Sequence, residues 1–205
     1  MSQALFSLPY FGPLSYYASL IKYDSILIES AENYQKQTYR NRQYIYGANG
    51  KLMLNIPVKH SKSKHRSKYI ESEIENDFNW QELHFKSLES AYRTSPYFEF
   101  YEADIEPLFK KKYTSLFQFN LTCFKTLIEL LNLEFKFGMT ESYQKEHKTL
   151  VDCRNLVSAK KKQINLKSTY HQVFEDKYGF IPDLSILDLL FNLGPESTTY
   201  LKSIS

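Results

Sequence analysis

The fold that we expect is decided by residues 4–29, which read ALFSLPYFGPLSYYASLIKYDSILIE. Ala4–Leu8 has the apolar character of a short buried strand and stops at Pro9. Gly12-Pro13 then opens a helix that runs to about Tyr23, with proline at the first helical position, where its missing N–H costs nothing. Ser25–Glu29 is a second short apolar strand. A strand, helix and strand of this size form a βαβ crossover, which predicts parallel pairing.

Downstream of this unit, the sequence predicts further strands. Gln43–Tyr46 and Leu52–Val58 flank Gly47-Ala-Asn-Gly50, and Asn-Gly between two such segments is a strong hairpin signal. Tyr69–Ile74 alternates apolar and polar residues, which favours one more strand. The parallel unit and the hairpin together predict a small mixed sheet.

The C-terminal half has a helical pattern. Three segments combine a polar residue in a capping position with a following helical run, at Asn79 for residues 79–94, Ser115 for 116–133 and Asp183 for 184–193. Cys123 falls within the second run and is expected to be a small core residue. We therefore expect an α/β protein of one domain over residues 1–205, with covering helices and a mostly helical C-terminal half.

Composition excludes several functional classes. The chain has 205 residues, 42% of them apolar and 24% charged, as in an ordinary globular protein. A formal net charge of +3 gives no nucleic-acid footprint, so no nucleic-acid partner is expected. No stretch of about 18 apolar residues predicts a membrane span, and the first residues lack the pattern of a signal peptide. We expect a cytoplasmic protein.

The common signatures of cofactor and metal sites are missing from the sequence. No glycine-rich phosphate loop occurs among the six glycines, and no nucleophile elbow or metalloprotease motif is found. The five histidines and two cysteines lack metal-ligand spacing. We expect neither a metal nor a bound cofactor.

The turn between the first strand and the first helix is a candidate ligand site. Free backbone N–H groups at a helix start attract anions, and ligands of parallel sheets tend to lie at the carboxyl ends of strands. Tyr10 could stack on a sugar or a base there. A tight connection with a packed tyrosine is an equally good interpretation of the same residues.

Residues 33–42, NYQKQTYRNR, concentrate positive charge among amides and tyrosines. Arg40 and Arg42 lie on one face if the backbone is extended, because alternate side chains then point the same way. Together with Lys36 they could hold a phosphate or a carboxylate. A solvated surface loop is the alternative.

Lys59–Lys68 holds five basic residues and two histidines without an acidic residue. The segment could bind phosphate, yet it has no aromatic residue on which a base could stack. Repulsion among its like charges and the lack of apolar residues favour a mobile, solvated loop.

His84 is the candidate general base. It shares a helical stripe with Trp80, Leu88 and Ala91, so its side chain is expected to point inward or toward the rim of a cleft. A partly buried imidazole that faces a cleft is suited to proton transfer near neutral pH. A hydrogen-bonded core histidine is the more common outcome for such a position. A nucleophilic Cys153 paired with His171 is a further possibility that the sequence leaves open.

Several stretches, in order along nearly the whole chain, resemble the WbqC-like protein family, in the form found in Bacteroides-type bacteria. They are Leu8-Pro-Tyr-Phe with Gly12-Pro, the segment Asn33–Arg42, Asn79-Trp80 with His84, Tyr92 with Pro96-Tyr-Phe98, Asn120, Tyr170-His-Gln-Val-Phe and Leu184-Ser-Ile-Leu-Asp-Leu-Leu-Phe-Asn192. The most specific of them are the segment that ends at Arg42 and the one that ends at Asn192.

This resemblance implies a role in making O-antigen or capsular polysaccharide. It suggests transfer of glycine or another acyl group onto a nucleotide-linked amino sugar, with a sugar nucleotide or an acyl donor as the small-molecule partner. The candidate residues at matching positions are Lys36, Asn41, Arg42, His84, Asn120 and Gln172. A non-catalytic binding or scaffold protein of the same machinery is the alternative.

Overall fold

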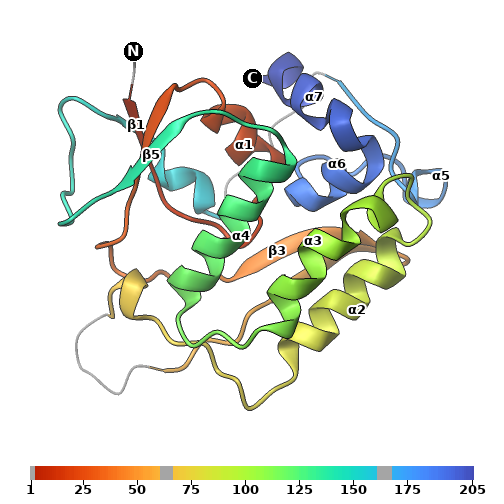
Figure 1. Ribbon diagram of the computed structural model, residues 1–205, viewed down its shortest axis with the longest axis horizontal. Coiled ribbons are helices and arrows are strands. Elements are labelled where there is room, and N and C mark those ends of the chain that lie inside the picture. Colours follow the sequence, from red (N-terminus) through yellow and green to blue (C-terminus); the bar gives the residue numbers. More distant parts are fainter. Residues whose placement is uncertain (1–2, 61–66, 161–167) are drawn as a thin grey trace.

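A computed structural model describes residues 3–60, 67–160 and 168–205 and shows a parallel sheet beside packed helices (Figure 1). The strands of this sheet lie in the order β5-β2-β1-β6 and all pair in parallel. They are β1 (Gln3–Phe6), β2 (Ser25–Ile28), β5 (Lys136–Met139) and β6 (Val151–Asp152). Helix α1 (Leu14–Leu20) joins β1 to β2, so the predicted βαβ crossover is confirmed.

The predicted hairpin is also confirmed, and it forms a sheet of its own. β3 (Arg42–Gly47) pairs antiparallel with β4 (Gly50–Asn55), and Gly47 lies opposite Gly50 at the turn. Gly50 has a φ of +93°, which glycine adopts without the steric cost of a Cβ. The α/β fold class is therefore confirmed, with its parallel and antiparallel strands in two separate sheets.

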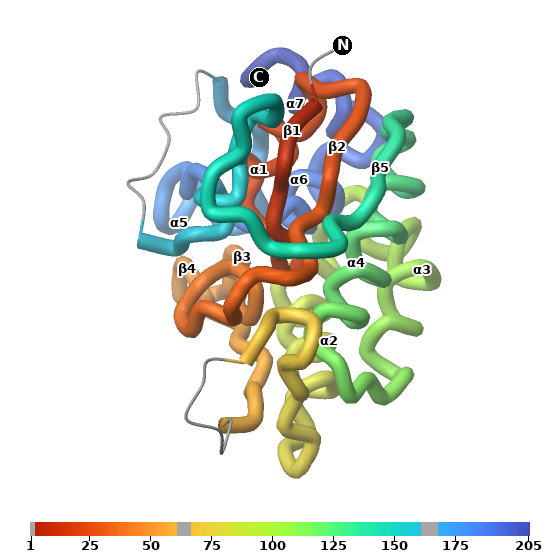
Figure 2. The backbone as a smooth tube through the Cα atoms, turned by 90° about the vertical axis from the view of Figure 1, so that its left-hand side faces the viewer, coloured from red at the N-terminus to blue at the C-terminus, as the bar shows by residue number. Residues whose placement is uncertain are grey.

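The remaining helices follow from residue 80 onward. They are α2 (Trp80–Tyr92), α3 (Phe98–Lys110), α4 (Leu116–Leu130), α5 (Glu175–Tyr178), α6 (Ile186–Leu193) and α7 (Ser197–Ile204). Short 3₁₀ turns span Tyr69–Glu71, Arg154–Val157 and Gly194–Glu196. Figure 2 shows β1, β2 and β5 side by side, and Figure 1 shows α2 and α3 packed together. Among the described residues, no helix is both long and apolar enough to cross a membrane.

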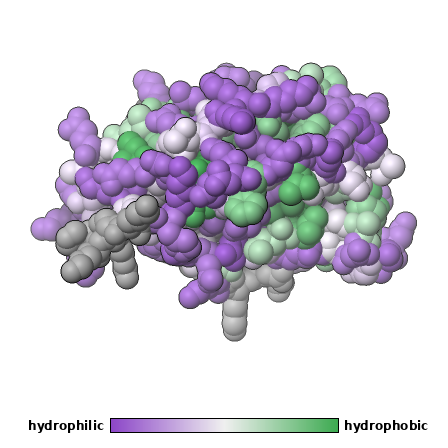
Figure 3. All heavy atoms as spheres, turned by 90° about the horizontal axis from the view of Figure 1, so that it is seen from below, coloured by the Kyte–Doolittle hydropathy of each residue, from purple (hydrophilic) through white to green (hydrophobic). Residues whose placement is uncertain are grey.

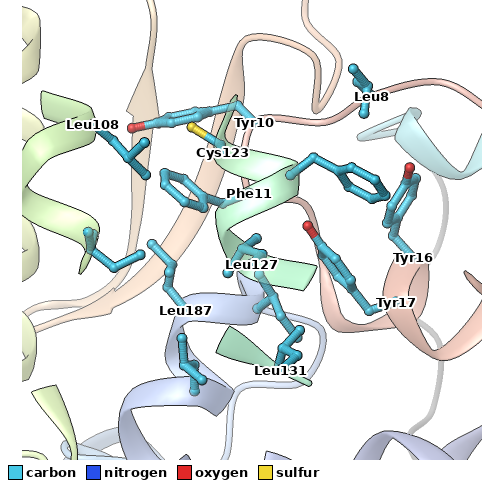
Figure 4. Packing of buried hydrophobic residues seen from close by; sticks show 14 of the residues in the cluster. Leu8, Tyr10, Phe11, Tyr16, Tyr17, Leu108, Cys123, Leu127, Leu131 and Leu187 are labelled. Atoms are coloured by element: carbon cyan, nitrogen blue, oxygen red, sulfur yellow. The ribbon is translucent and has the colours of Figure 1, made fainter. Parts of the chain in front are cut away.

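The core is rich in aromatic residues that come from both halves of the chain. Figure 4 shows Tyr10, Phe11 and Cys123 packed together, with Tyr16 and Tyr17 beside them. Each of these side chains is almost completely buried, which confirms Cys123 as a core residue. Burial in an apolar core removes these rings from water and favours folding, and it makes them inaccessible to a ligand.

Two local predictions were wrong. Tyr69–Glu71 is a 3₁₀ turn, and beyond it Ile74 makes only an isolated bridge with Val58. The alternation of residues 69–74 therefore reflects which side chains face inward in a short irregular segment. Asp183 does not cap α6, because that helix begins two residues after the predicted start and uses Ser185 as its N-cap.

Asp183 instead caps the first helix. Its carboxylate accepts hydrogen bonds from the backbone N–H of Ser15, at 2.8 Å, and from the Ser15 hydroxyl, at 3.0 Å. An acceptor at a helix start satisfies a backbone N–H group that has no partner within the helix. The contact ties the C-terminal part of the chain to the βαβ unit.

The other helix boundaries shift slightly. Pro13 was expected to be the first residue of the first helix, but it is the N-cap, and α1 begins at Leu14. The helix ends at Leu20, three residues before the expected end at Tyr23. Ser115 accepts a hydrogen bond from the Gln118 N–H, as predicted. Asn79 stands at the start of α2 but donates to the Glu82 side chain and makes no side-chain hydrogen bond to the backbone.

Of the basic segment Lys59–Lys68, residues 61–66 lie outside the described residues, so its predicted mobility stays a prediction.

Candidate functional site

A cavity of about 670 Å³ lies between the 34–42 segment and two stretches around residues 55–60 and 67–73. Two short backbone pairings hold its walls. Tyr34 donates its N–H to the Ser67 carbonyl at 2.9 Å, and Lys59 donates its N–H to the Glu73 carbonyl at 2.9 Å. Three of the predicted binding residues line this cavity: Lys36, Asn41 and Arg42. We call it the Arg42 cavity.

Arg42 opens β3 opposite Asn55 and is partly buried in the cavity wall. Within the described part of the chain, its guanidinium makes neither an ion pair nor a hydrogen bond, and its Nε is a buried donor without an acceptor. An unmade hydrogen bond at a buried donor costs roughly 1–3 kcal/mol. The strand therefore holds the Arg42 guanidinium in place, and its donors are free to bind a ligand.

Asn41 contributes a second unpartnered atom to the same wall. Its side-chain nitrogen donates to the Asn55 Oδ1 at 3.0 Å and to the Ile56 carbonyl at 3.2 Å. Because the carbonyl can only accept, these contacts fix the orientation of the amide. Among the described residues, no donor reaches the buried Asn41 Oδ1. Unpartnered polar atoms on two consecutive residues mark this wall as the candidate binding surface.

The other charged groups of the cavity mostly have partners. The Lys59 Nζ lies 3.1 Å from Glu73 Oε2, and the Lys36 Nζ lies 3.1 Å from His60 Nδ1. Glu71 accepts a hydrogen bond from the Lys68 N–H through Oε2, at 3.2 Å. The described residues of the cavity thus include three cationic side chains and two carboxylates, and among them only Lys59 is paired with a carboxylate.

Asn55, Glu71 and Glu73 also line the cavity, although no sequence motif indicates a role for them. The two glutamates fall in the segment expected to be a strand, Tyr69–Ile74, where apolar and polar residues alternate. That alternation does place both side chains at the cavity. The backbone pairing of residues 73–75 with residues 57–59 is a long-range contact, and no local pattern indicates it.

Arg40 does not share the face of Arg42. It is 2% exposed and makes a bidentate contact with Glu32, at 3.0 Å from Nε to Oε1 and 2.7 Å from Nη2 to Oε2. It also donates to the hydroxyls of Ser7 and Thr38. The expectation that both arginines hold one ligand group is therefore corrected, because the backbone between them is not extended and Arg40 is consumed by a buried ion pair.

His84 has the environment of a core histidine, the more common of the two outcomes expected for it. It is 6% exposed, and its Nδ1 lies 2.9 Å from the hydroxyl of Tyr10, on which its ring also stacks. Burial lowers the pKa of His84 to about 4, and a hydrogen bond with the Asn55 backbone opposes this only in part. His84 does not line the Arg42 cavity, so we do not assign it the role of base.

The predicted turn site is likewise closed. Residues 8–13 are all buried, and Tyr10 is completely inaccessible, so its ring packs in the core and has no open face for a sugar. The packed-tyrosine interpretation of this turn describes the structure. Tyr10 and His84 together join the turn to α2.

Gln172 and Asn120 are buried in hydrogen-bond networks. The Asp188 carboxylate accepts hydrogen bonds from Tyr92, at 2.8 Å, from Tyr170, at 2.5 Å, and from Gln172, at 2.8 Å. Burial raises the pKa of Asp188, and these hydrogen bonds oppose the shift. We call these four residues the Asp188 cluster. Asn120 donates to the Arg40 carbonyl and the Tyr69 hydroxyl and so supports the backbone beside the cavity.

The structure does not bring Cys153 and His171 together as partners. The Cys153 Sγ lies 3.9 Å from the Tyr23 hydroxyl, whereas His171 is exposed and its Nδ1 lies 2.7 Å from Glu175. Within residues 3–60, 67–160 and 168–205, no group of three or more histidine, cysteine, aspartate or glutamate side chains is placed to hold a metal ion.

Comparison with known proteins agrees with the motifs. The model of the WbqC-like protein family matches residues 7–168, which include the cavity residues and end before Gln172. The uncharacterized protein Rv1507c of Mycobacterium tuberculosis is 24% identical over 213 residues, and the match covers 91% of each chain. No solved structure matches the chain. Because the family model covers well over half of its residues, the chain belongs to the WbqC-like protein family.

Proposed function

We propose that this protein binds an anionic, nucleotide-linked amino sugar in the Arg42 cavity as part of surface-polysaccharide assembly. The observation that carries the proposal is Arg42 itself. It is an arginine held at the start of a strand, with a buried unpartnered Nε and, in the described part of the chain, no carboxylate partner. Buried or half-buried arginines are ordinarily paired, so the missing partner is the anion of a ligand.

The size and the charge of the cavity support this class of ligand. Its volume of about 670 Å³ is in the range of small-molecule sites. With Lys59 neutralised by Glu73, Lys36 and Arg42 are left to hold negative charge. The planar guanidinium can donate two parallel hydrogen bonds to a phosphate or a carboxylate, which fixes the orientation of the ligand as well as its charge.

Membership in the family supports a role for this ligand in polysaccharide synthesis, and we propose O-antigen or capsule synthesis. For the acyl- or aminoacyl-transferase activity that the resemblance suggests, the amino sugar must lose a proton as it attacks the acyl donor. Of the histidines that the structure describes, His60 lines the cavity, beside Lys36, whereas His84 lies in the core. Binding of the sugar nucleotide is the part of the function that the geometry supports best.

A non-catalytic scaffold role is the second candidate, and exposed apolar side chains favour it. Leu83 on α2 is 62% exposed and Phe100 on α3 is 70% exposed, although both helices otherwise bury their apolar faces. Figure 3 shows one face of the molecule, on which apolar side chains gather in patches among hydrophilic ones. A contiguous apolar patch on such a surface would be suited to a partner protein.

A thermal-shift screen with sugar nucleotides and acyl donors separates these candidates. A ligand that binds only the folded state raises the melting temperature according to the ratio of its concentration to its Kd. We expect sugar nucleotides to stabilise the wild type and to have little effect on an Arg42→Met variant. A screen in which no anionic ligand raises the melting temperature contradicts the proposed binding function and favours the scaffold.

A further inference from the structure

We propose that the Arg42 cavity selects the free-amine form of the sugar over the N-acylated form, through the carboxylate of Glu71. This inference rests on the proposed function and names the chemical state of the ligand. It follows from a comparison of the two acidic residues of the cavity. Glu71 and Glu73 are separated by one residue, line the same space and have different partners.

Glu73 is neutralised within the protein. Its Oε2 lies 3.1 Å from the Lys59 Nζ, so one of the cavity's cations and one of its anions cancel each other. This carboxylate has little reason to attract a cationic ligand. Its effect on the site is to hold Lys59 away from the ligand's phosphate.

Glu71 has no cationic partner in the part of the chain that the structure describes. Within the described residues, Oε2 accepts one hydrogen bond, from the Lys68 N–H, and Oε1 accepts none. A carboxylate can accept several hydrogen bonds, so most of the capacity of Glu71 is unused. Among the described residues of the cavity, the other charges that no carboxylate or cation pairs are the cations Lys36 and Arg42, so the carboxylate of Glu71 creates a second pole of opposite sign.

A ligand that fits both poles carries an anion and a cation. A sugar nucleotide with a free amine is such a molecule, because its diphosphate is negative and its protonated amine is positive. Acylation of the amine removes that charge and adds bulk, so the product loses its contact with Glu71. The site would therefore hold the substrate of an acyl transfer more tightly than its product, which favours release after reaction.

The test is calorimetric titration with UDP-glucosamine and UDP-N-acetylglucosamine at a mildly acidic pH, where the sugar amine is protonated. We expect the free-amine form to bind about fivefold more tightly, the upper value for a partly solvated ion pair. Glu71→Gln should bring the ratio of the two affinities to about one. Glutamine keeps an oxygen for the Lys68 N–H, so the local turn is preserved.

Two control variants test whether the ratio of the two affinities depends on Glu71 alone. Glu73→Gln releases Lys59, so it should strengthen binding of both ligands by a similar factor and keep their ratio. Glu134→Gln removes an exposed charge outside the cavity and should change neither affinity. Equal affinities of the wild type for the two ligands would overturn the inference and leave the proposed function standing. If neither ligand binds, the proposed function itself fails.

Discussion

Arg40 and Arg42 stand two residues apart in the same family-like segment, yet they belong to two different regions. Arg40 is buried and its guanidinium is held by Glu32, in the same way that the donors around Asp188 are held by its carboxylate. Arg42 belongs to an open cavity whose wall keeps donors and acceptors without partners. The partners of a polar residue, more than its place in a motif, therefore separate a structural role from a binding role.

The largest effect is expected from Arg40→Met. Methionine has a similar length but no charge, so Glu32 would be left buried and unpaired. Loss of one partner of a buried ion pair costs about 3–5 kcal/mol, whereas Arg42→Met removes a buried donor that has no acceptor and should leave the free energy of unfolding unchanged or raise it. Urea denaturation of both variants measures the contrast. Similar losses at the two positions would erase the distinction between the two regions.

A pH effect of similar size is expected at His84. Its pKa is lowered from 6.5 to about 4 in the folded protein, so neutral His84 stabilises the fold above about pH 6.5. Each pKa unit corresponds to about 1.36 kcal/mol, so the lowered pKa of His84 contributes about 3 kcal/mol to the free energy of unfolding. This contribution is lost as the pH falls from 6.5 through 4, because the unfolded chain then binds a proton that the folded protein does not. His84→Gln cannot titrate, so its free energy of unfolding should fall less than that of the wild type over this range. Parallel pH profiles would show that His84 is accessible to solvent.

A smaller loss is expected from Tyr92→Phe in the Asp188 cluster. The Tyr92 hydroxyl accepts a hydrogen bond from the Tyr46 N–H and donates one to Asp188, and thus connects the hairpin to α6. Its removal leaves a buried N–H without an acceptor, which costs about 1–3 kcal/mol. We expect the melting temperature to fall while affinity for the cavity ligand stays the same. A selective loss of affinity would place the cluster in the binding site.

Much of the fold could be predicted because its signals are local. The βαβ unit, the Asn-Gly hairpin and the Ser115 cap each depend on residues close together in the chain. The role of Asp183 could not be predicted in this way, because the helix that it caps lies 168 residues away in the sequence. The capping preference of aspartate was correctly recognised, but the sequence does not indicate which helix it caps.

The candidate site was predicted in part for the same reason. Lys36, Asn41 and Arg42 were expected to bind and do line one cavity. Arg40, Asn120 and Gln172 have the same polar character but lie in the core, and only their distant partners reveal this. Glu71 and Glu73 reach the cavity through a backbone pairing that has no local signature.

The most direct test of the binding site is calorimetric titration of UDP-glucosamine into the wild type and into Arg42→Lys. Lysine keeps the positive charge but cannot reproduce the two parallel hydrogen bonds of the guanidinium. We expect the variant to unfold at the same temperature and to lose about 1.5–3 kcal/mol of binding free energy, which is the contribution of a charge-assisted hydrogen bond. Equal Kd values for the two proteins would contradict the assignment of Arg42 as the anion-binding residue.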